Sequence, residues 1–311
     1  MNVVFMGTPD FAVKTLEKLY EKEHNVMAVF TQPDKPKGRG YKLVPPPVKV
    51  LAQSHNTPVY QPQSLKNGGE EYIKILKELN PDCIVVTAYG KFLPKEVLEI
   101  PEYGCVNVHG SLLPKYRGAG PIQWAVLNDE KETGITTMLM GEKMDNGDIL
   151  LQRSTPIGEN ETASELFDRL AQIGADLLEE TLEKLQTTGI VPVKQEDEKA
   201  TYAPMLSKDM CVLDFSLPAR KVHKKICGLS DWPCAVTMLD GKRLKVYKSH
   251  IVSEKQMSVQ AGTITDEKSF TVACGEGAVA FDEIQAEGSK RMKTADFLRG
   301  KPVKKGAVLG K

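Results

Sequence analysis

Short apolar runs alternate with amphipathic segments along the first half of the chain. The runs at 2–6, 26–31 and 83–88 have the length of buried strands, whereas 11–19 and 70–79 carry apolar residues at helical spacing. Strands that alternate with helices predict an α/β domain with a Rossmann-like, doubly wound, mostly parallel sheet. In such sheets ligands bind at the carboxyl ends of the strands.

The pattern changes near residue 210, where short apolar segments separated by turns replace the alternation. Asp240-Gly241 between two such segments is a hairpin signal, and 219–228 is the one amphipathic helix among them. These features predict a small OB-like β-barrel. We therefore expect a catalytic domain at 1–189, a linker at 190–207, which is rich in proline and mixed charge, and a C-terminal domain at 208–311.

Composition is that of an ordinary soluble protein, but charge is unevenly distributed. The 41 basic and 41 acidic residues cancel overall, while residues 1–189 hold 20 basic against 26 acidic and residues 190–311 hold 21 against 15. The resulting charges of about −6 and +6 suggest a basic C-terminal module with an anionic partner, although an imbalance of this size is also common between domains.

Six cysteines occur without a C-x-x-C pair, so we expect buried, reduced thiols rather than disulfides or zinc ligands. The N-terminus runs directly into an apolar strand, and no apolar run reaches membrane-spanning length. These observations predict a cytoplasmic protein with no membrane partner.

Residues 32–49 differ from their surroundings in composition. This stretch contains five prolines, two glycines, one acid and five basic residues, Lys35, Lys37, Arg39, Lys42 and Lys49. The prolines and glycines predict an irregular, exposed loop, and a loop this long inside a compact domain is usually functional. Tyr41 among the cations favours nucleic-acid binding over the alternative of a solvated charged insertion.

Three polar groups follow strands that end on the predicted ligand edge. Asn107 and His109 alternate with Val106 and Val108, so both point to one side of a strand, and Asp145 lies in a glycine-bounded turn after the next strand. No serine or cysteine lies in a nucleophile motif, and this donor set is poor for a metal. What remains is transfer chemistry in which the substrate brings its own nucleophile.

In that chemistry Asn107 would supply an oxyanion donor, His109 a proton-carrying imidazole and Asp145 a carboxylate that orients the ring or accepts a proton. Each residue also has a structural interpretation. A histidine at a strand end is often simply hydrogen-bonded there, an asparagine often caps the backbone, and an aspartate near a turn glycine often forms an Asx-turn.

The sequence resembles the methionyl-tRNA formyltransferase family along its whole length. The motifs that carry this resemblance are F-M-G-T-P-D-F at 5–11, F-T-Q-P-D at 30–34, N-V-H-G-S-L-L-P-K-Y-R-G-A-G-P-I at 107–122, M-D-N-G-D at 144–148 and D-F-L-R-G at 296–300. The resemblance implies 10-formyltetrahydrofolate as the formyl donor, no metal, and initiator methionyl-tRNA as the acceptor.

The resemblance also implies roles for residues. Asn107, His109 and Asp145 would be catalytic, and the folate site would be lined by Ser111, Leu112, Leu113 and Pro114. The basic loop would contact tRNA through Lys35, Lys37, Arg39 and Lys42, and the two domains would hold the tRNA between them. We expect a monomer. The alternatives are formyl transfer to a small amine such as a nucleotide sugar or ribonucleotide, hydrolysis of the formyl-folate, or a non-catalytic RNA-binding protein.

Overall fold

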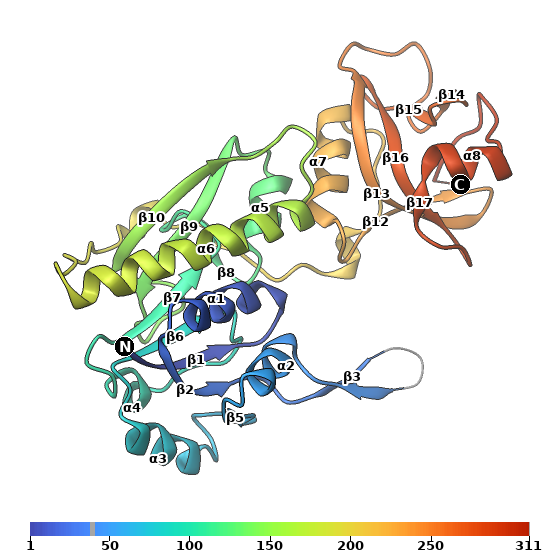
Figure 1. Cartoon of the computed structure of the whole chain (residues 1–311). Coiled ribbons are helices and arrows are strands. Elements are labelled where there is room, and N and C mark those ends of the chain that lie inside the picture. The colour runs from blue at the N-terminus through green and yellow to red at the C-terminus, as the bar shows by residue number, and fades with distance from the viewer. Residues whose placement is uncertain (38–40, 311) are drawn as a thin grey trace. The chain divides into compact units, whose positions relative to one another are not determined.

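The computed structural model describes residues 1–37 and 41–310, which form two compact units (Figure 1). The first unit comprises residues 1–118, 134–155 and 167–202, and the second comprises 119–133, 156–166 and 203–311. Two insertions, 119–133 and 156–166, thus pack with the C-terminal residues although they interrupt the first unit in sequence. The sequence prediction places both segments in the domain at 1–189.

A seven-stranded sheet forms the centre of the first unit. In order across the sheet its strands are β10 (Ile149–Pro156), β9 (Glu132–Leu139), β7 (Cys105–His109), β6 (Cys83–Thr87), β1 (Asn2–Gly7), β2 (Asn25–Phe30) and β5 (Val59–Tyr60). All pairs from β7 to β5 are parallel, and β9 runs antiparallel to β7. The predicted Rossmann-like, mostly parallel sheet is confirmed.

Helices cover both faces of this sheet. They are α1 (Asp10–Glu21), α2 (Pro47–Ser54), α3 (Glu70–Leu79), α4 (Lys95–Leu98) and α6 (Ala163–Gln186). Gly174 of α6 approaches Val108 so closely that a Cβ would lie 3.0 Å from its side chain. Because strand side chains alternate, Asn107 and His109 point away from α6, toward the face where α3 and α4 pack on Val86.

The second unit is built on an antiparallel sheet with the order β12 (Ala235–Leu239), β13 (Lys242–Ser253), β16 (Ala278–Ala286), β15 (Thr271–Ala273) and β14 (Ile264–Asp266), and β17 (Met292–Lys293) also pairs with β16. Register shifts along the β13–β16 pair bend these strands around an apolar core. Helices α5 (Pro121–Leu127), α7 (Ala219–Leu229) and α8 (Thr294–Gly300) complete the unit. The sequence predicts a small OB-like β-barrel here, and the C-terminal β domain with antiparallel strands is confirmed.

Several local predictions are also confirmed. Asp240 and Gly241 have φ values of 50° and 68° and form the two-residue turn between β12 and β13, as expected for a hairpin turn with two positive φ angles. All six cysteines are free and buried. Burial raises the pKa of the Cys83 and Cys227 thiols to about 12, which keeps them protonated and unreactive. No helix in the described part of the chain has the length and apolar character needed to span a membrane.

The expectation of an irregular loop at 32–49 is wrong in part. The described residues form a short antiparallel hairpin, β3 (Lys35–Lys37) and β4 (Lys42–Val44), in which Pro36 lies opposite Leu43. Both strands of a two-stranded ribbon are edge strands. A proline can therefore occupy a position where the backbone N–H would point outward, because no hydrogen bond between the strands is lost there. Arg39 lies outside the described residues.

The predicted linker contains short ordered elements, which are β11 (Tyr202–Ala203), the 3₁₀ turn at Asp197–Lys199, and a bridge between Val193 and Ile149. β11 pairs with β8 (Arg117–Gly118). Residues 193–202 are therefore hydrogen-bonded into the first unit, rather than forming a free tether.

A capping box fixes the start of α6, as the sequence predicts. The Glu165 carboxylate accepts hydrogen bonds from the Thr162 backbone N–H at 3.0 Å and from its hydroxyl at 2.8 Å, and the Thr162 hydroxyl accepts the Glu165 N–H at 3.3 Å. We expect Thr162→Ala to lower the free energy of unfolding by about 1 kcal/mol, because it removes the cap. Urea denaturation would measure the loss. Thr188→Ala, an exposed threonine beyond the other end of α6, is the control and should leave the midpoint unchanged.

Candidate active site

Strand β7 places the two central side chains of the candidate site. Asn107 lies between Val86 of β6 and Met138 of β9, and His109 lies opposite Thr136. Both residues are buried, with 8% and 6% of their surface exposed. An amide and an imidazole therefore lie side by side at the carboxyl end of an internal strand, as the sequence predicts.

The hydrogen bonds of His109 define the chemistry of its two ring nitrogens. Nε2 lies 3.0 Å from the backbone carbonyl of Tyr116, which can only accept, so Nε2 carries a proton. Nδ1 faces Asp145 Oδ1 at 3.8 Å. This distance is too long for a direct hydrogen bond, so the Tyr116 carbonyl orients the ring while the carboxylate acts on it through charge. Nδ1 is the nitrogen that remains available to a substrate.

Asp145 is held in a tight turn between β9 and β10. Its backbone adopts a left-handed conformation with φ 48°, and its Oδ2 accepts the Gly118 N–H at 2.8 Å, which leaves Oδ1 directed toward His109. Gly147 is required in this turn because a Cβ there would lie 1.6 Å from the Leu139 carbonyl oxygen. The turn thus packs against the end of β9, and this contact places the carboxylate.

The Asn107 side chain forms no hydrogen bond with any described residue, although it is almost fully buried. Its polar atoms are not completely buried, so the amide can be reached by water or by a ligand. Its N–H donors are therefore free to meet a developing negative charge.

The four residues predicted to line the folate site take different positions. The Ser111 side chain is fully buried and donates to the Lys115 carbonyl at 2.6 Å, and Leu113 is buried with its N–H bonded to Thr136. Leu112 and Pro114 are only partly buried. Ser111 and Leu113 thus shape the loop after β7, and Leu112 and Pro114 are the two with surface left for a ligand.

Three of the four predicted tRNA-contact residues, Lys35, Lys37 and Lys42, lie on the β3–β4 hairpin, and the fourth, Arg39, is outside the described residues. Lys35 and Lys42 are exposed, Lys37 lies on β3, and Tyr41 at the tip has 79% of its surface exposed. The hairpin follows the carboxyl end of β2, which runs parallel to the strand that ends at His109. It therefore rises from the same edge of the sheet as the candidate site.

A hydrogen-bonded network fixes the base of the hairpin. Lys49 Nζ contacts both Asp34 oxygens at 2.8 and 2.9 Å and Gln61 Oε1 at 2.8 Å, and Gln61 Nε2 bonds to Asp34 and to the Gln32 carbonyl. These bonds, above all that from Lys49, lower the pKa of the Asp34 carboxyl. Lys49, which the sequence groups with the other loop cations, is thus occupied in holding the hairpin.

Sequence patterns missed two side chains of this region, Arg117 and Gln195. Arg117 is buried and its guanidinium bonds to Gln195 Oε1 and to Asp197. Gln195 lies in the stretch that composition marks as linker. No periodicity or motif relates two residues 78 positions apart, so only the fold reveals the pair.

Comparison with known proteins defines the class to which this fold and site belong. Residues 1–182 match the formyl transferase family and residues 205–302 match the formyl transferase C-terminal domain. The protein is therefore a formyl transferase.

Full-length relatives narrow this class. A methionyl-tRNA formyltransferase of Caldanaerobacter subterraneus subsp. tengcongensis is 50% identical over 309 residues, which are 99% of this chain and 100% of that protein. One of Trichlorobacter lovleyi is 50% identical over 310 residues, covering 99% and 96%. The chain belongs to the methionyl-tRNA formyltransferase family, as the sequence motifs predict.

Solved structures share the fold at low sequence identity. An N-formyltransferase from Helicobacter canadensis, in complex with folinic acid and dTDP-3-aminofucose, matches with a TM-score of 0.68 and 18% identity, covering 91% of this chain and 98% of that one. HypX from Aquifex aeolicus, in complex with tetrahydrofolic acid, matches with a TM-score of 0.64 and 17% identity, covering 95% and 46%. At these identities the likeness supports the fold.

Proposed function

We propose that the protein transfers a formyl group from 10-formyltetrahydrofolate to the free α-amino group of methionyl-initiator tRNA, and so makes N-formylmethionyl-tRNA for translation initiation in the cytoplasm. The observation that carries the proposal is the grouping of a free Asn107 amide, His109 Nδ1 and the Asp145 carboxylate at one strand end. Family membership supports both the reaction and the tRNA acceptor.

In the proposed reaction the neutral α-amine attacks the formyl carbon, which forms the new C–N bond and makes the formyl oxygen negative. Collapse of this tetrahedral intermediate breaks the bond from the formyl carbon to N10, and N10 takes up the proton that the amine gives up, so tetrahydrofolate leaves. The Asn107 amide and the protonated His109, through Nδ1–H, donate to this oxyanion. Asp145, 3.8 Å from Nδ1, balances the charge of the imidazolium and assists removal of the amine proton. Because Nε2 stays bonded to the Tyr116 carbonyl, the ring keeps one orientation while Nδ1 works.

The proposed folate donor agrees with the position of the site at the carboxyl edge of a parallel sheet, where ligands of such folds bind. The folate-bound state of the two structural neighbours is consistent with this donor. Leu112 and Pro114 keep exposed apolar surface beside the site and are the proposed contacts. The proposed chemistry requires no metal, because the attacking amine needs only a proton acceptor and an oxyanion site.

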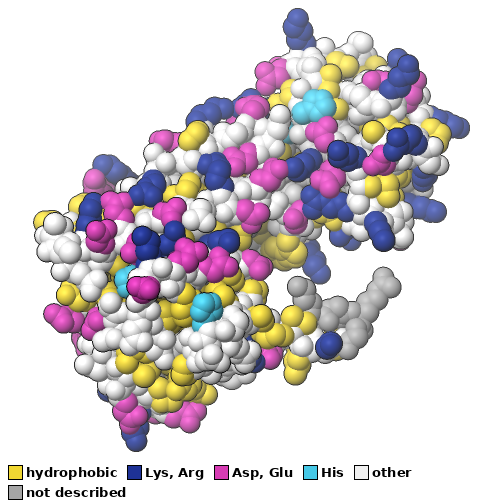
Figure 2. Space-filling model, viewed as in Figure 1, with side chains coloured by type: hydrophobic (Ala, Val, Ile, Leu, Met, Phe, Trp, Pro, Cys, Tyr) yellow, Lys and Arg dark blue, Asp and Glu magenta, His cyan; other side chains and the backbone are white. Residues whose placement is uncertain are grey.

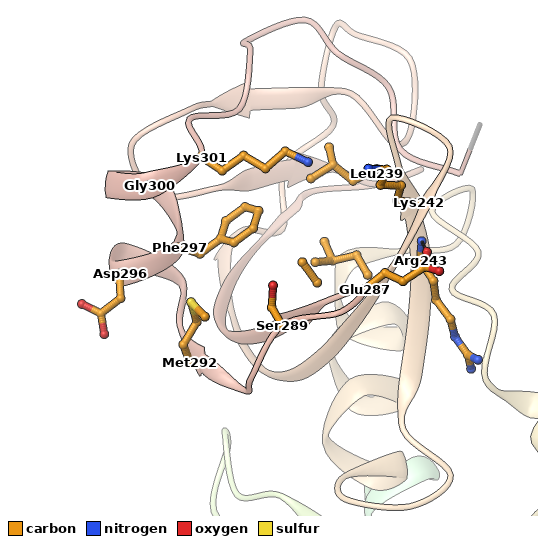
Figure 3. A pocket seen from close by; sticks show the side chains of 12 residues that line it. Leu239, Lys242, Arg243, Glu287, Ser289, Met292, Asp296, Phe297, Gly300 and Lys301 are labelled. Atoms are coloured by element: carbon orange, nitrogen blue, oxygen red, sulfur yellow. Dashed lines mark hydrogen bonds between the residues drawn. The ribbon is translucent and has the colours of Figure 1, made fainter. Parts of the chain in front are cut away.

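A polyanionic partner suits the C-terminal part of the second unit, where residues 203–311 hold 19 Lys and Arg against 12 Asp and Glu. Figure 2 shows Lys and Arg side chains spread over this unit. A cavity of about 300 Å³ there is lined by the apolar Leu239 and Phe297, and by charged residues of both signs, which are Lys242, Arg243, Lys301, Glu287 and Asp296 (Figure 3). None of these three cations forms an ion pair with an acidic residue in the described part of the chain. We assign this surface to general contact with tRNA phosphates.

The decisive experiment is transfer of labelled formyl from 10-formyltetrahydrofolate to methionyl-tRNA, with uncharged tRNA as the control. Formylated methionyl-tRNA is the expected product. A labelled nucleotide sugar or ribonucleotide would instead support a small-molecule transferase, and release of formate in water would support a hydrolase. Failure to bind the folate would favour a non-catalytic RNA-binding protein.

The β3–β4 hairpin makes a separate prediction about tRNA binding. Lys35→Ala combined with Lys42→Ala should weaken binding of methionyl-tRNA and reduce the slope of log affinity against log salt by about 1 to 2, because each phosphate contact contributes close to 1. Filter binding at several salt concentrations would measure both quantities. Lys74→Ala combined with Lys77→Ala, on α3, is the matched control and should leave the slope unchanged. An unchanged slope in the hairpin variant would make the hairpin a solvated surface feature.

A further inference from the structure

One side-chain amide, that of Gln195, joins the Asp145 turn to a buried arginine. Gln195 Nε2 donates to the backbone carbonyls of Asp145 at 2.9 Å and Gly147 at 2.7 Å. Its Oε1 accepts from Arg117 Nε at 3.0 Å and Nη2 at 2.9 Å. The two carbonyls can only accept and the guanidinium can only donate, so these partners fix which end of the amide faces the turn.

Arg117 is anchored independently of Gln195. Its side chain is buried, Nη2 also bonds to Asp197 Oδ1 at 2.8 Å, and its backbone N–H donates to the Thr201 carbonyl at 2.8 Å. The next residue, Gly118, donates its N–H to Asp145 Oδ2. The Arg117–Gly118 segment therefore holds the Asp145 carboxylate directly, and through Gln195 it also holds the Asp145 backbone.

We propose that Gln195 is a positioning residue for the formyl transfer reaction, because it fixes the turn that carries Asp145. The inference rests on the proposed catalytic role of Asp145. Asp145 has the left-handed φ of 48°, a conformation that is uncommon for non-glycine residues although Asp tolerates it better than most, so contacts that hold the turn help to maintain it. The two hydrogen bonds from one Nε2 hold the carbonyls of Asp145 and Gly147, and so fix the segment of the turn that directly follows Asp145.

The position of the carboxylate matters because the gap from Oδ1 to His109 Nδ1 is already 3.8 Å. Misplacement of a catalytic group by about 1 Å can cost about 100-fold in rate. Loss of the Gln195 hydrogen bonds would let the turn shift, and Asp145 would then move relative to the His109 ring, which the Tyr116 carbonyl holds in place. The hydrogen bonds of Gln195 go to Arg117 and to the backbone of the turn, so its effect on the carboxylate passes through the turn.

Two substitutions of Gln195 separate positioning from simple structural support. Gln195→Glu keeps the side-chain length and the oxygen that faces Arg117, and gives that arginine a charged partner, but it turns a second oxygen toward two carbonyls. Gln195→Met keeps the length and removes every hydrogen bond. If Gln195 positions the turn, kcat should fall several-fold in the Met variant and about 10-fold to 100-fold in the Glu variant. The KM for methionyl-tRNA should stay within about twofold, since hairpin and surface contacts, not the turn, would set it.

If Gln195 only stabilises the fold, the two variants should rank differently in kcat. Thermal stability should then decide activity, and the Glu variant, with its Arg117 ion pair, should be the more active of the two. Glu196→Gln is the matched control, because Glu196 is the next residue, is exposed, and its carboxylate pairs with the exposed Lys199 rather than with Arg117 or the Asp145 turn. Full kcat in the Glu variant would overturn the inference. Asp145→Asn separates failure of this inference from failure of the proposed active site. If the Asp145→Asn enzyme is active, Asp145 has no catalytic role. If it is inactive while the Gln195 variants have normal kcat, Asp145 is catalytic but Gln195 does not position it.

Discussion

Asp145→Asn should lower kcat for formylation of methionyl-tRNA by about 100-fold or more while the protein remains folded. The substitution preserves size, and the new amide oxygen can still accept the Gly118 N–H that Oδ2 accepts at 2.8 Å. What it removes is the negative charge 3.8 Å from His109 Nδ1. Single-turnover transfer of labelled formyl would measure the chemical step separately from tRNA binding.

Asp148→Asn is the matched control for this substitution. Asp148 lies three residues further along the same turn, and its contribution to the turn is through its backbone carbonyl, which accepts the Leu139 N–H at 2.9 Å. We expect its kcat to stay within about twofold of the unmodified enzyme, as for most surface substitutions. Equal losses in the two variants would mean that the turn as a whole, rather than the Asp145 charge, supports the reaction.

The sequence predicts the sheet well because its strands are short apolar runs between amphipathic helices. β1 and β6 are fully or almost fully buried, and a strand buried on both faces needs little beyond an unbroken apolar run. The same holds for the turn at Asp240-Gly241, where two adjacent residues contain the information for the hairpin. Local patterns succeed where local interactions decide the structure.

The β3–β4 hairpin shows the limit of this reasoning. Its prolines predict an irregular loop, yet Lys35 pairs with Val44 and Lys37 with Lys42. Bonds from Lys49 to Asp34 and Gln61, made at sequence distances of 15 and 12, hold the base of this ribbon. The amino-acid composition shows the prolines but cannot show these side-chain hydrogen bonds. The sequence therefore predicts an irregular loop where the structure has a short hairpin.

Some residues of the candidate site can likewise be predicted from local sequence patterns, whereas others cannot. Asn107 and His109 are two residues apart on one strand, so alternation alone places them together. Asp145 comes from the following turn at the same edge. Tyr116 enters the site through a backbone carbonyl, which no side-chain motif reports, and Gln195 reaches the Asp145 turn from 50 residues away. The groups that would react can be predicted from sequence, whereas the groups that orient them depend on long-range folding.

Asn107→Ala should lower kcat by about 100-fold to 1,000-fold, the usual cost of removing one donor to a developing oxyanion. The affinities for methionyl-tRNA and for the folate should change little, because the charge that Asn107 meets exists only in the transition state. The unpaired state of its amide among the described residues makes this separation clean, since no structural hydrogen bond is lost.

Asn107→Asp tests the sign of the same interaction. It is nearly isosteric, but it places a carboxylate where the oxyanion would form, so its loss of kcat should be at least as large as that of the alanine variant. Asn107 has only 8% of its surface exposed, so a substitution there can disturb the packing around it. Circular dichroism and the unfolding midpoint would therefore be measured to establish that both variants fold. An aspartate variant more active than the alanine variant would mean that position 107 faces a positive or proton-donating group in the transition state, and the oxyanion assignment would pass to His109 alone.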